Sequence, residues 1–298
     1  MKLAPECRTC LLTKVRSQSE LVTNDEEVLA KVTSECTDVY DRYLENDPRA
    51  AVAAGEVHRT CYRLIGSNDP YTEMKRQDNE AAAKVAAAVR PNLHTLHDYM
   101  TAAIIGNTID YGVTGHEIST DLVAFFEKML AKGLALDDSE EFFKLADRVV
   151  YFTDNCGEVI FDKLFCEELR KNGSHVTIVV KEKPMLNDVT VKEAADIRLE
   201  DAADVVLHSG GGAQLGSHPP YFPPEVKDAV DSATLIISKG LANYESLTEY
   251  AVRPPVAYLL MVKCDAVGRD VGAKKGDMIA VLRRPTSITD HEQGKSAQ

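Results

Sequence analysis

Residues 149–165 read VVYFTDNCGEVIFDKLF, and this stretch decides the fold class. Its first four residues are apolar, and an amphipathic helical pattern begins at Glu158. Asp154, Asn155 and a glycine at 157 stand between the two patterns. A short, continuous apolar run followed at once by a helix is typical of a strand–helix unit whose sheet is covered on both faces. The stretch therefore predicts an α/β domain that begins near residue 148.

Four further apolar runs repeat this pattern along the chain. After VVYF at 149–152 come VTIVV at 176–180, VVL at 205–207, LIIS at 235–238 and VAYLLMV at 256–262. Segments with helical patterns separate the runs, at 158–173, 189–197 and 223–233. This alternation predicts a three-layer α/β domain with a mainly parallel sheet over residues 148–285.

The first half of the chain has a different texture. Residues 25–44, 79–107 and 119–133 carry apolar residues at helical spacing and are rich in good helix formers. Pro91 should begin a new helix or kink one, and Ser119 and Gly133 should begin and end one. No strand is expected before residue 148. We therefore predict a mostly helical domain over residues 1–147 and a polar tail over residues 286–298.

Charge and cysteine content exclude several classes of protein. The 298-residue chain has a formal net charge of −13, which disfavours binding to a nucleic-acid backbone. No apolar run is long enough for a membrane helix, and the N-terminus lacks the apolar segment of a secretory signal. The seven cysteines are an odd number and suggest free thiols. We expect a cytoplasmic protein that binds neither nucleic acid nor membrane; its oligomeric state stays open.

Polar and charged residues follow each predicted strand. In chain order they are Asp154, Asn155 and Glu158; Asn187 and Asp188; His208 with Gly210, Gly211 and Gly212; Lys239 and Asn243; and Lys263. Because ligands bind at the carboxyl ends of parallel strands, we expect these residues to converge on one edge. Carboxylate and amide oxygens suit hard divalent cations, whereas glycine-rich turns and lysines suit phosphate. The set predicts metal-assisted phosphoryl chemistry.

Each feature also has a plainer interpretation. An Asp-Asn pair before a helix is a common N-cap, and three glycines often form only a mobile loop. A regulatory module that binds a nucleotide or a metal without catalysis would use the same residues. The CxxC pair Cys7–Cys10 would fit a metal or redox protein. A haloacid-dehalogenase-type phosphatase would need a second aspartate where this chain has Cys156.

Seven stretches carry a family resemblance. They are CRTC at 7–10, GNTIDY at 106–111, TDNCGE at 153–158, LNDVT at 186–190, SGGG at 209–212, KGLANYE at 239–245 and VKCDAVG at 262–268. In this order, across nearly the whole chain, they resemble the damage-control phosphatase family, formerly known only as a domain of unknown function. The N-terminal CxxC is similar to that of the prokaryotic and archaeal branch.

The resemblance implies a helical domain packed on a Rossmann-like domain. It also implies a divalent-metal-dependent phosphatase acting on small phosphorylated metabolites, such as sugar phosphates, damaged nucleotides or related intermediates. The metal, Mn²⁺, Ni²⁺, Co²⁺ or Mg²⁺, would be held by Asp154, Asn155 and Asp188. Substrate phosphate would be met by Lys239, Asn243 and Lys263, and Asn107 and Asp110 would face the cleft. Glu245 stands where eukaryotic members often carry a basic residue, so their sugar-phosphate preference does not transfer.

Our mechanistic hypothesis is in-line attack by a metal-activated water. Lys239, Lys263 and the backbone amides of Gly210 to Gly212 would hold the phosphoryl oxygens. Glu158 is the candidate to orient or deprotonate the water, and its alternative role is helix capping. Attack by Asp154 itself, through an aspartyl phosphate, is the competing mechanism.

The thiols take no part in this scheme. For Cys7 and Cys10 we favour a structural or weakly metal-binding role, and Cys36 and Cys61 are the residues that could complete a site with them.

Overall fold

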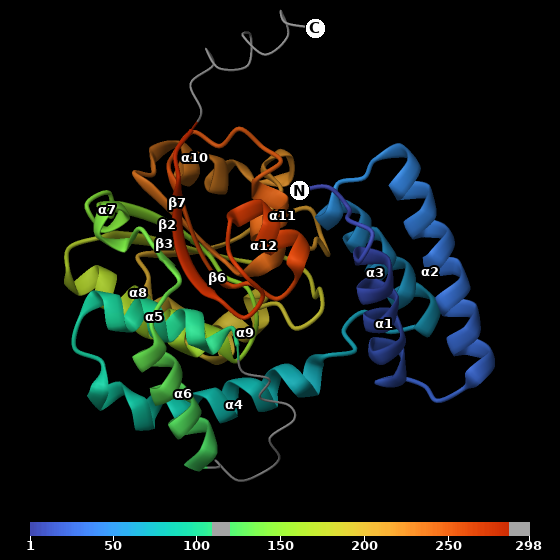
Figure 1. Cartoon of the computed structure of the whole chain (residues 1–298), viewed down its shortest axis with the longest axis horizontal. Helices are drawn as coiled ribbons and strands as arrows, with labels where there is room; N and C mark the ends of the chain where they lie inside the picture. The colour runs from blue at the N-terminus through green and yellow to red at the C-terminus, as the bar shows by residue number, and fades with distance from the viewer. Residues whose placement is uncertain (109–119, 286–298) are drawn as a thin grey trace, which may run out of the picture.

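The structure is a computed structural model that describes residues 1–108 and 120–285. The predicted polar tail at 286–298, Asp110 and Ser119 lie outside the described residues. A central sheet has helices on both faces, and α1, α2 and α3 stand together at one side of the molecule (Figure 1).

The twelve α-helices have the following bounds: α1 Cys7–Glu20, α2 Glu26–Asn46, α3 Ala50–Ile65, α4 Thr72–Val89, α5 Leu96–Gly106, α6 Thr120–Lys132, α7 Ser139–Phe143, α8 Glu158–Lys171, α9 Val191–Asp196, α10 Pro224–Ser232, α11 Gly240–Leu247 and α12 Asp265–Val271. Short 3₁₀ helices are η1 Arg90–Asn92, η3 Leu199–Ala202 and η4 Pro219–Tyr221. The strands are β1 Leu136–Asp137, β2 Arg148–Phe152, β3 His175–Val180, β4 Val205–His208, β5 Leu235–Lys239, β6 Val256–Met261 and β7 Met278–Arg283. These counts cover the described residues alone.

The sheet has the order β1-β7-β6-β5-β2-β3-β4. Strands β4, β3, β2, β5 and β6 are parallel, whereas β7 runs antiparallel to β6 and pairs in parallel with β1. From β2 the chain first builds outward through β3 and β4, then crosses back to β5 and β6. The direction of winding therefore reverses between β2 and β5, where open α/β sheets form their ligand crevice.

The Rossmann-like, mainly parallel fold predicted from the sequence is confirmed. All five predicted runs form strands, β2 to β6. The expectation of no strand before residue 148 is wrong, because β1 pairs with β7 through residues 136 and 137. A two-residue strand at a sheet edge carries too few residues to show an apolar pattern. The apolar run of β7 gave a usable signal that the prediction missed.

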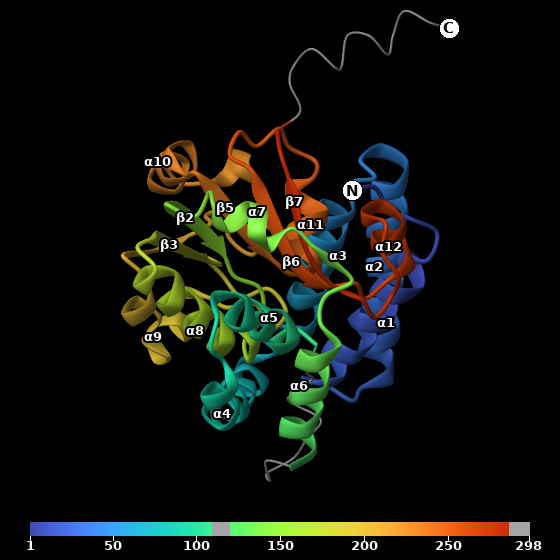
Figure 2. The same cartoon turned by 60° about the vertical axis from the view of Figure 1, so that its left-hand side comes forward.

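Alternate residues of β2 enter different cores. Val149 and Tyr151 join the core made with α4, α5, α6 and α8, whereas Val150 and Phe152 join the core made with α10, α11 and α12. Figure 2 shows the sheet between α5 and α8 on one side and α11 and α12 on the other. Burial of both faces explains why the strands read as continuous apolar runs.

The helical first half of the chain divides into two packing units. Helices α1 to α3 enclose a core of their own, which includes Val15, Val32, Tyr40 and Val57. Helices α4 to α6 instead share the core of α8 and the sheet. The prediction that a new helix begins near Pro91 agrees with the structure: α4 ends at Val89, the short helix η1 contains the proline and α5 begins at Leu96.

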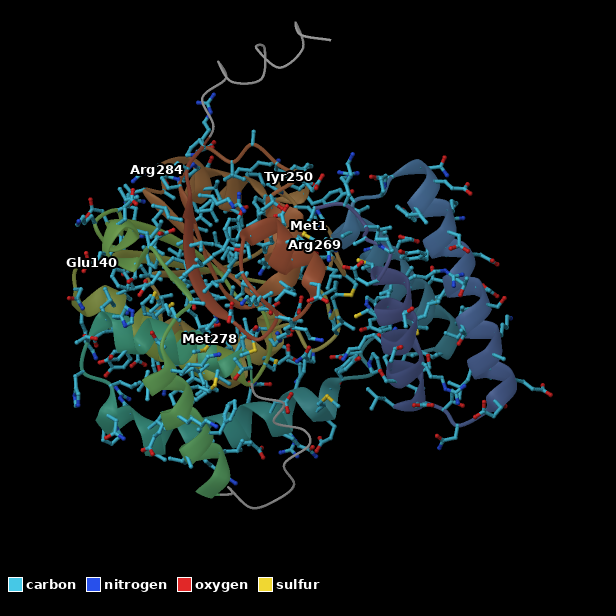
Figure 3. All side chains as sticks on the ribbon, in the orientation of Figure 1. Met1, Glu140, Tyr250, Arg269, Met278 and Arg284 are labelled. Atoms are coloured by element: carbon cyan, nitrogen blue, oxygen red, sulfur yellow. The ribbon has the colours of Figure 1, made fainter. Side chains whose placement is uncertain are left out.

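Polar contacts tie α1–α3 to the α/β layers. The Met1 ammonium donates to the Glu245 carbonyl at 2.8 Å, and an Arg269 guanidinium nitrogen lies 2.6 Å from a Glu6 carboxylate oxygen. In Figure 3, Met1 and Arg269 lie on the side of the α/β layers that faces these helices. Contacts of both backbone and side-chain groups therefore join α1–α3 to the α/β layers. Across the described ranges, none of the helices combines the length and apolar character needed to cross a membrane.

Candidate active site

The loop that follows β2 forms the first part of the site. It is joined to the loop after β3 by backbone contacts: the Cys156 N–H donates to the Asn187 carbonyl at 2.8 Å, and Asn155 and Asp188 form an antiparallel bridge. The backbone thereby places Asp154, Asn155 and Asp188 side by side. The sequence predicted this convergence, because both loops leave the same edge of neighbouring parallel strands.

A glycine on β5's side of the crevice makes room for Asp154. Gly240, the first residue of α11, has φ +76°. A Cβ at this position would lie 1.8 Å from Asp154 Oδ2, which is far inside van der Waals contact. Both the backbone conformation and the close carboxylate therefore require glycine at residue 240.

The side-chain amides of Asn107 and Asn155 bridge the carboxylates of Asp154 and Glu158. Asn107 Nδ2 donates to Asp154 Oδ2 at 3.1 Å and also to Glu158 Oε2. Asn155 Nδ2 donates to the same two oxygens at 2.7 and 3.2 Å. Burial and then the negative charge of Glu158 raise the pKa of Asp154 to about 6. Asn107 comes from the end of α5, so the helical part of the chain does face the site as predicted.

Lys239 has a different place from the one predicted. Its side chain is fully buried, and its ammonium donates to Glu158 Oε1 at 2.9 Å, Asp162 Oδ1 at 2.6 Å and the Ala103 carbonyl at 3.0 Å. Burial disfavours the charged form, but Asp162 and Glu158 outweigh it and raise the pKa of Lys239. With all three donor positions occupied inside the protein, Lys239 fixes Glu158 and does not reach a bound phosphate.

Asn243 is likewise an internal residue. It is fully buried, and its Nδ2 donates to the Thr153 carbonyl at 2.9 Å and the Lys239 carbonyl at 2.8 Å. Its Oδ1 accepts from the Ser217 hydroxyl at 2.8 Å. Asn243 therefore joins the end of β2 to the start of α11 and stabilises the loop that carries Asp154.

Lys181 is a site residue that the sequence reasoning missed. Its buried ammonium donates to the Gly216 carbonyl at 2.6 Å and lies 3.8 Å from Asp188 Oδ2. Burial raises the pKa of Asp188 well above its ordinary value and lowers the pKa of Lys181. The sequence did contain a signal for this residue. Lys181 comes directly after β3, just as the predicted site residue Lys263 comes shortly after β6.

A cavity of about 450 Å³ opens beside these residues. One part of its lining comes from α5 and the loops at the strand ends, and the other part comes from α1 and α4. The lining residues are Gly106, Asn107, Thr108, Asn155, Cys156, Glu158, Asn187 and Lys263, together with Lys14, Ser17, Leu21, Tyr71, Met74 and Asp78. Asp154 is not itself part of the described lining, but it is hydrogen-bonded to Asn107 and Asn155, which are part of it.

The glycine-rich loop lies elsewhere. Gly210 N–H donates to His208 Nδ1 at 3.3 Å, Gly212 N–H donates to Glu182 Oε2 at 2.7 Å, and neither these residues nor Gly211 is part of the described cavity lining. The reason is strand order: β4 is an edge strand, two positions from the β2–β5 crevice. The structure thus does not bring Gly210 and Gly211 to the predicted phosphate site.

The cysteines are free thiols at different depths. Cys7 and Cys10 lie at the start of α1, whereas Cys36 and Cys61 are buried in the α1–α3 core, against which Cys7 packs. Within residues 1–108 and 120–285 no group of three or more His, Cys, Asp or Glu side chains is arranged to hold a metal. Burial also raises the pKa of Cys156, which argues against a reactive thiolate there.

The donor atoms at the β2 and β3 loops do fit a hard cation. Asp188 Oδ2 and Asn107 Oδ1 are buried and have no hydrogen-bond partner in the described part of the chain. Beside them stand the Asp154 carboxylate and the Asn155 amide. Two carboxylates with amide oxygens match the preference of Mg²⁺ or Mn²⁺ for oxygen ligands.

Tyr62 of α3 holds the loop that carries Asp188. Leu186, two residues earlier, has φ +51°, a left-handed conformation that costs a non-glycine residue about 1 kcal/mol. Its N–H donates to the Tyr62 hydroxyl oxygen at 2.8 Å. We expect Tyr62→Phe to lower the free energy of unfolding by about 1 kcal/mol and to speed amide exchange over residues 185–189.

Hydrogen-exchange mass spectrometry on the folded protein measures this effect. Tyr40→Phe is the matched control, because Tyr40 is also a buried tyrosine but belongs to α2 and packs inside the α1–α3 core. Equal exchange over 185–189 in Tyr62→Phe and wild type would show that the hydroxyl does not hold the loop.

Comparisons with known proteins find relatives that match nearly the whole chain. A family model described as the damage-control phosphatase ARMT1-like domain matches residues 3–279. A damage-control phosphatase of Archaeoglobus fulgidus is 36% identical over 286 residues, covering 94% of this chain and 99% of its own length. One from Pyrococcus horikoshii is 32% identical over 291 residues, covering 95% and 99%. The crystal structure of a DUF89 family protein from Pyrococcus horikoshii matches with a TM-score of 0.87 at 31% identity, covering 94% of this chain and 99% of that one.

Proposed function

The chain belongs to the damage-control phosphatase family defined by the ARMT1-like domain, and from this premise we propose that it is a metal-dependent phosphatase of small phosphorylated metabolites. The observation that carries the proposal is the cluster of Asp154, Glu158, Asn107 and Asn155 at the β2–β5 crevice, beside a cavity. Buried carboxylates without a full set of internal cations are costly unless a bound ligand or proton compensates them.

Asp154, Asn155 and Asp188 are the residues that would hold the divalent cation. Bound there, it would supply positive charge to the phosphoryl oxygens and lower the pKa of a water molecule. Asn107 presents a further buried amide to the same place. The cation is Mn²⁺, Ni²⁺, Co²⁺ or Mg²⁺, all of which accept oxygen ligands.

Glu158 is the proposed proton acceptor. It lines the cavity, and its carboxylate is held by the Lys239 ammonium and by the Asn107 and Asn155 amides. A carboxylate fixed in this way orients a water molecule and accepts its proton without having to reorganise. Lys263 is exposed at the cavity and neutralises the oxygens of a bound phosphate.

The direct test is phosphate release from an aryl phosphate with each of the four cations in turn. We expect release that a chelator abolishes and that returning the cation restores. Because burial and Glu158 raise the pKa of Asp154 to about 6, this carboxylate gains a proton below that pH. The cation concentration for half-maximal activity should therefore rise up to about tenfold per pH unit on acidification below pH 6.

Three other readings give different results in the same assay. A regulatory module would bind the cation or a nucleotide without releasing phosphate. A protein whose chemistry depends on CxxC would lose activity in Cys7→Ser, whereas the proposed phosphatase keeps it. Acid-quenched enzyme that retains label from a labelled phosphate donor on Asp154 would replace water attack by the aspartyl-phosphate mechanism.

A further inference from the structure

Helix α4 carries two buried polar residues that the proposed chemistry does not use. Lys75 and Asn79 are 0% and 8% exposed and stand four residues apart, so they share one face of the helix. Neither is part of the described cavity lining. Buried polar side chains are costly unless they find hydrogen-bond or ion-pair partners. Both residues find partners in or directly after the loops that carry the proposed cation ligands.

Asn79 reaches the loop after β2. Its side-chain oxygen Oδ1 accepts the Gly157 N–H at 2.7 Å, and both residues are buried. Gly157 has φ +83° and stands at the N-cap of α8, where a backbone N–H has no partner inside the helix. Asn79 therefore supplies the acceptor that this buried N–H needs.

The turn at Gly157 sets the position of two side chains of the site. Asn155 lies two residues before this glycine, and Glu158 comes directly after it. The N–H just before the glycine, that of Cys156, donates to the Asn187 carbonyl at 2.8 Å and so joins the turn to the loop after β3. The contact from α4 therefore holds the backbone directly between the bridging amide and the proposed proton acceptor.

Lys75 fixes α4 against the loop after β3. Its Nζ lies 2.7 Å from Asp69 Oδ2 and 3.1 Å from Glu193 Oε1. Glu193 Oε2 in turn accepts the Thr190 N–H at 3.0 Å, and Thr190 is two residues after Asp188. Burial disfavours the charged form of Lys75, but the two carboxylates outweigh it and raise the pKa of this ammonium. Lys75 therefore stays charged and ties α4 to the loop that carries Asp188.

The contacts to the two loops are thus about one helical turn apart on α4. Because Lys75 fixes the helix relative to Asp188, the carboxamide of Asn79 meets the β2 loop at a set place. The proposed cation ligands come from both loops, Asp154 and Asn155 from one and Asp188 from the other. Residues that orient metal ligands without touching the metal commonly change metal affinity about 10–100-fold.

We propose that Asn79 is a positioning residue for the cation site. It holds the turn at Gly157 and thereby keeps Asn155 at the spacing from Asp188 that a shared cation needs. This inference rests on the proposed function, because it assigns Asn79 to the site that would bind the cation.

Isothermal titration calorimetry of the metal-free full chain, with each of the four proposed cations added alone, tests this role. Asn79→Ala removes the acceptor and should raise the Kd of the cation that binds most tightly about tenfold or more. Asn79→Asp keeps an acceptor oxygen for the Gly157 N–H and should restore binding to near the wild-type value. Hydrogen-exchange mass spectrometry on the same metal-free proteins should show faster exchange over residues 155–160 in Asn79→Ala than in Asn79→Asp or wild type.

Two controls separate positioning from other effects. Gln77→Ala removes an exposed carboxamide of α4 that bonds to Glu73 at the surface, and it should leave the Kd unchanged. Val32→Ala lowers stability from within the α1–α3 core, and it should also leave the Kd unchanged.

Two results would count against the inference alone. They are a Kd in Asn79→Ala equal to that of wild type, and an equal rise in Val32→Ala; either one leaves the proposed function standing. Wild-type protein that binds none of the four cations would instead refute the cation site, and the inference with it.

Discussion

Replacing Asp154 by alanine is expected to lower cation-dependent phosphate release at least about a thousandfold, equivalent to about 4 kcal/mol of transition-state stabilisation. Asp154 joins the β2 loop to both bridging amides and to the close glycine of α11. Its carboxylate supplies the negative charge that attracts the cation to this edge of the sheet. Steady-state turnover of an aryl phosphate over a range of cation concentrations measures the loss.

The same substitution should leave the protein folded. Burial and Glu158 raise the pKa of Asp154 from 3.8 to about 6, so the folded state binds this proton more tightly than the unfolded chain does. Above pH 6 the ionised carboxylate therefore costs stability, and that cost fades as the pH falls toward 4. We expect Asp154→Ala to unfold at a urea concentration no lower than wild type at pH 8.

Asp196→Ala supplies the control, because Asp196 is an exposed aspartate on α9 that pairs with Lys192 at the surface. It should change neither turnover nor stability appreciably. Turnover of Asp154→Ala within tenfold of wild type would remove Asp154 from the reaction and with it the proposed site.

Replacing Lys239 by methionine should produce the largest loss of stability, about 3–5 kcal/mol in the free energy of unfolding. Methionine fills a similar volume but leaves the Glu158 and Asp162 carboxylates without their cation, and both are fully buried. Burial already raises the pKa of Asp162 to about 7 in the presence of Lys239. Without Lys239 one of the two carboxylates should take up a proton, so the loss should be smaller at pH 5 than at pH 8.

Urea denaturation at the two pH values measures this effect. Lys171→Met is the control, because Lys171 is exposed and its pair with Glu168 lies at the end of α8, where an ion pair contributes at most about 1 kcal/mol. A Lys239→Met protein as stable as wild type at pH 8 would show that the carboxylates do not depend on this ammonium.

The contrast between Lys239 and Lys263 shows where prediction from sequence stops. Each stands at the end of a strand, and nothing in the neighbouring letters separates them. β5 is central and its end lies under α5 and α8, so Lys239 meets the Ala103 carbonyl and the carboxylates of α8. Lys263 lies past β6 and stays exposed at the cavity. Tertiary packing, which the local sequence does not encode, assigns one to support and the other to the ligand.

Strand order sets a similar limit. The pairing of Asp154 and Asn155 with Asp188 was predictable, because consecutive strand–helix units in a parallel sheet usually place their loops side by side. That the glycine loop lies away from this site could not be predicted, because an apolar run in the sequence does not show which strand lies at the edge of the sheet. The same holds for the helical half, whose continuous pattern conceals the change from the α1–α3 core to the core shared with the sheet.

The separate core of α1 to α3 has a consequence for how such an enzyme can diverge. These helices keep their own interior, yet they supply one side of the cavity. Substitutions on the exposed stripe of α1 can alter which molecules enter while the strand-end loops keep their arrangement. New substrate preferences can then be selected one residue at a time, without first repairing a damaged catalytic centre, which makes this helix the natural place to begin directed evolution.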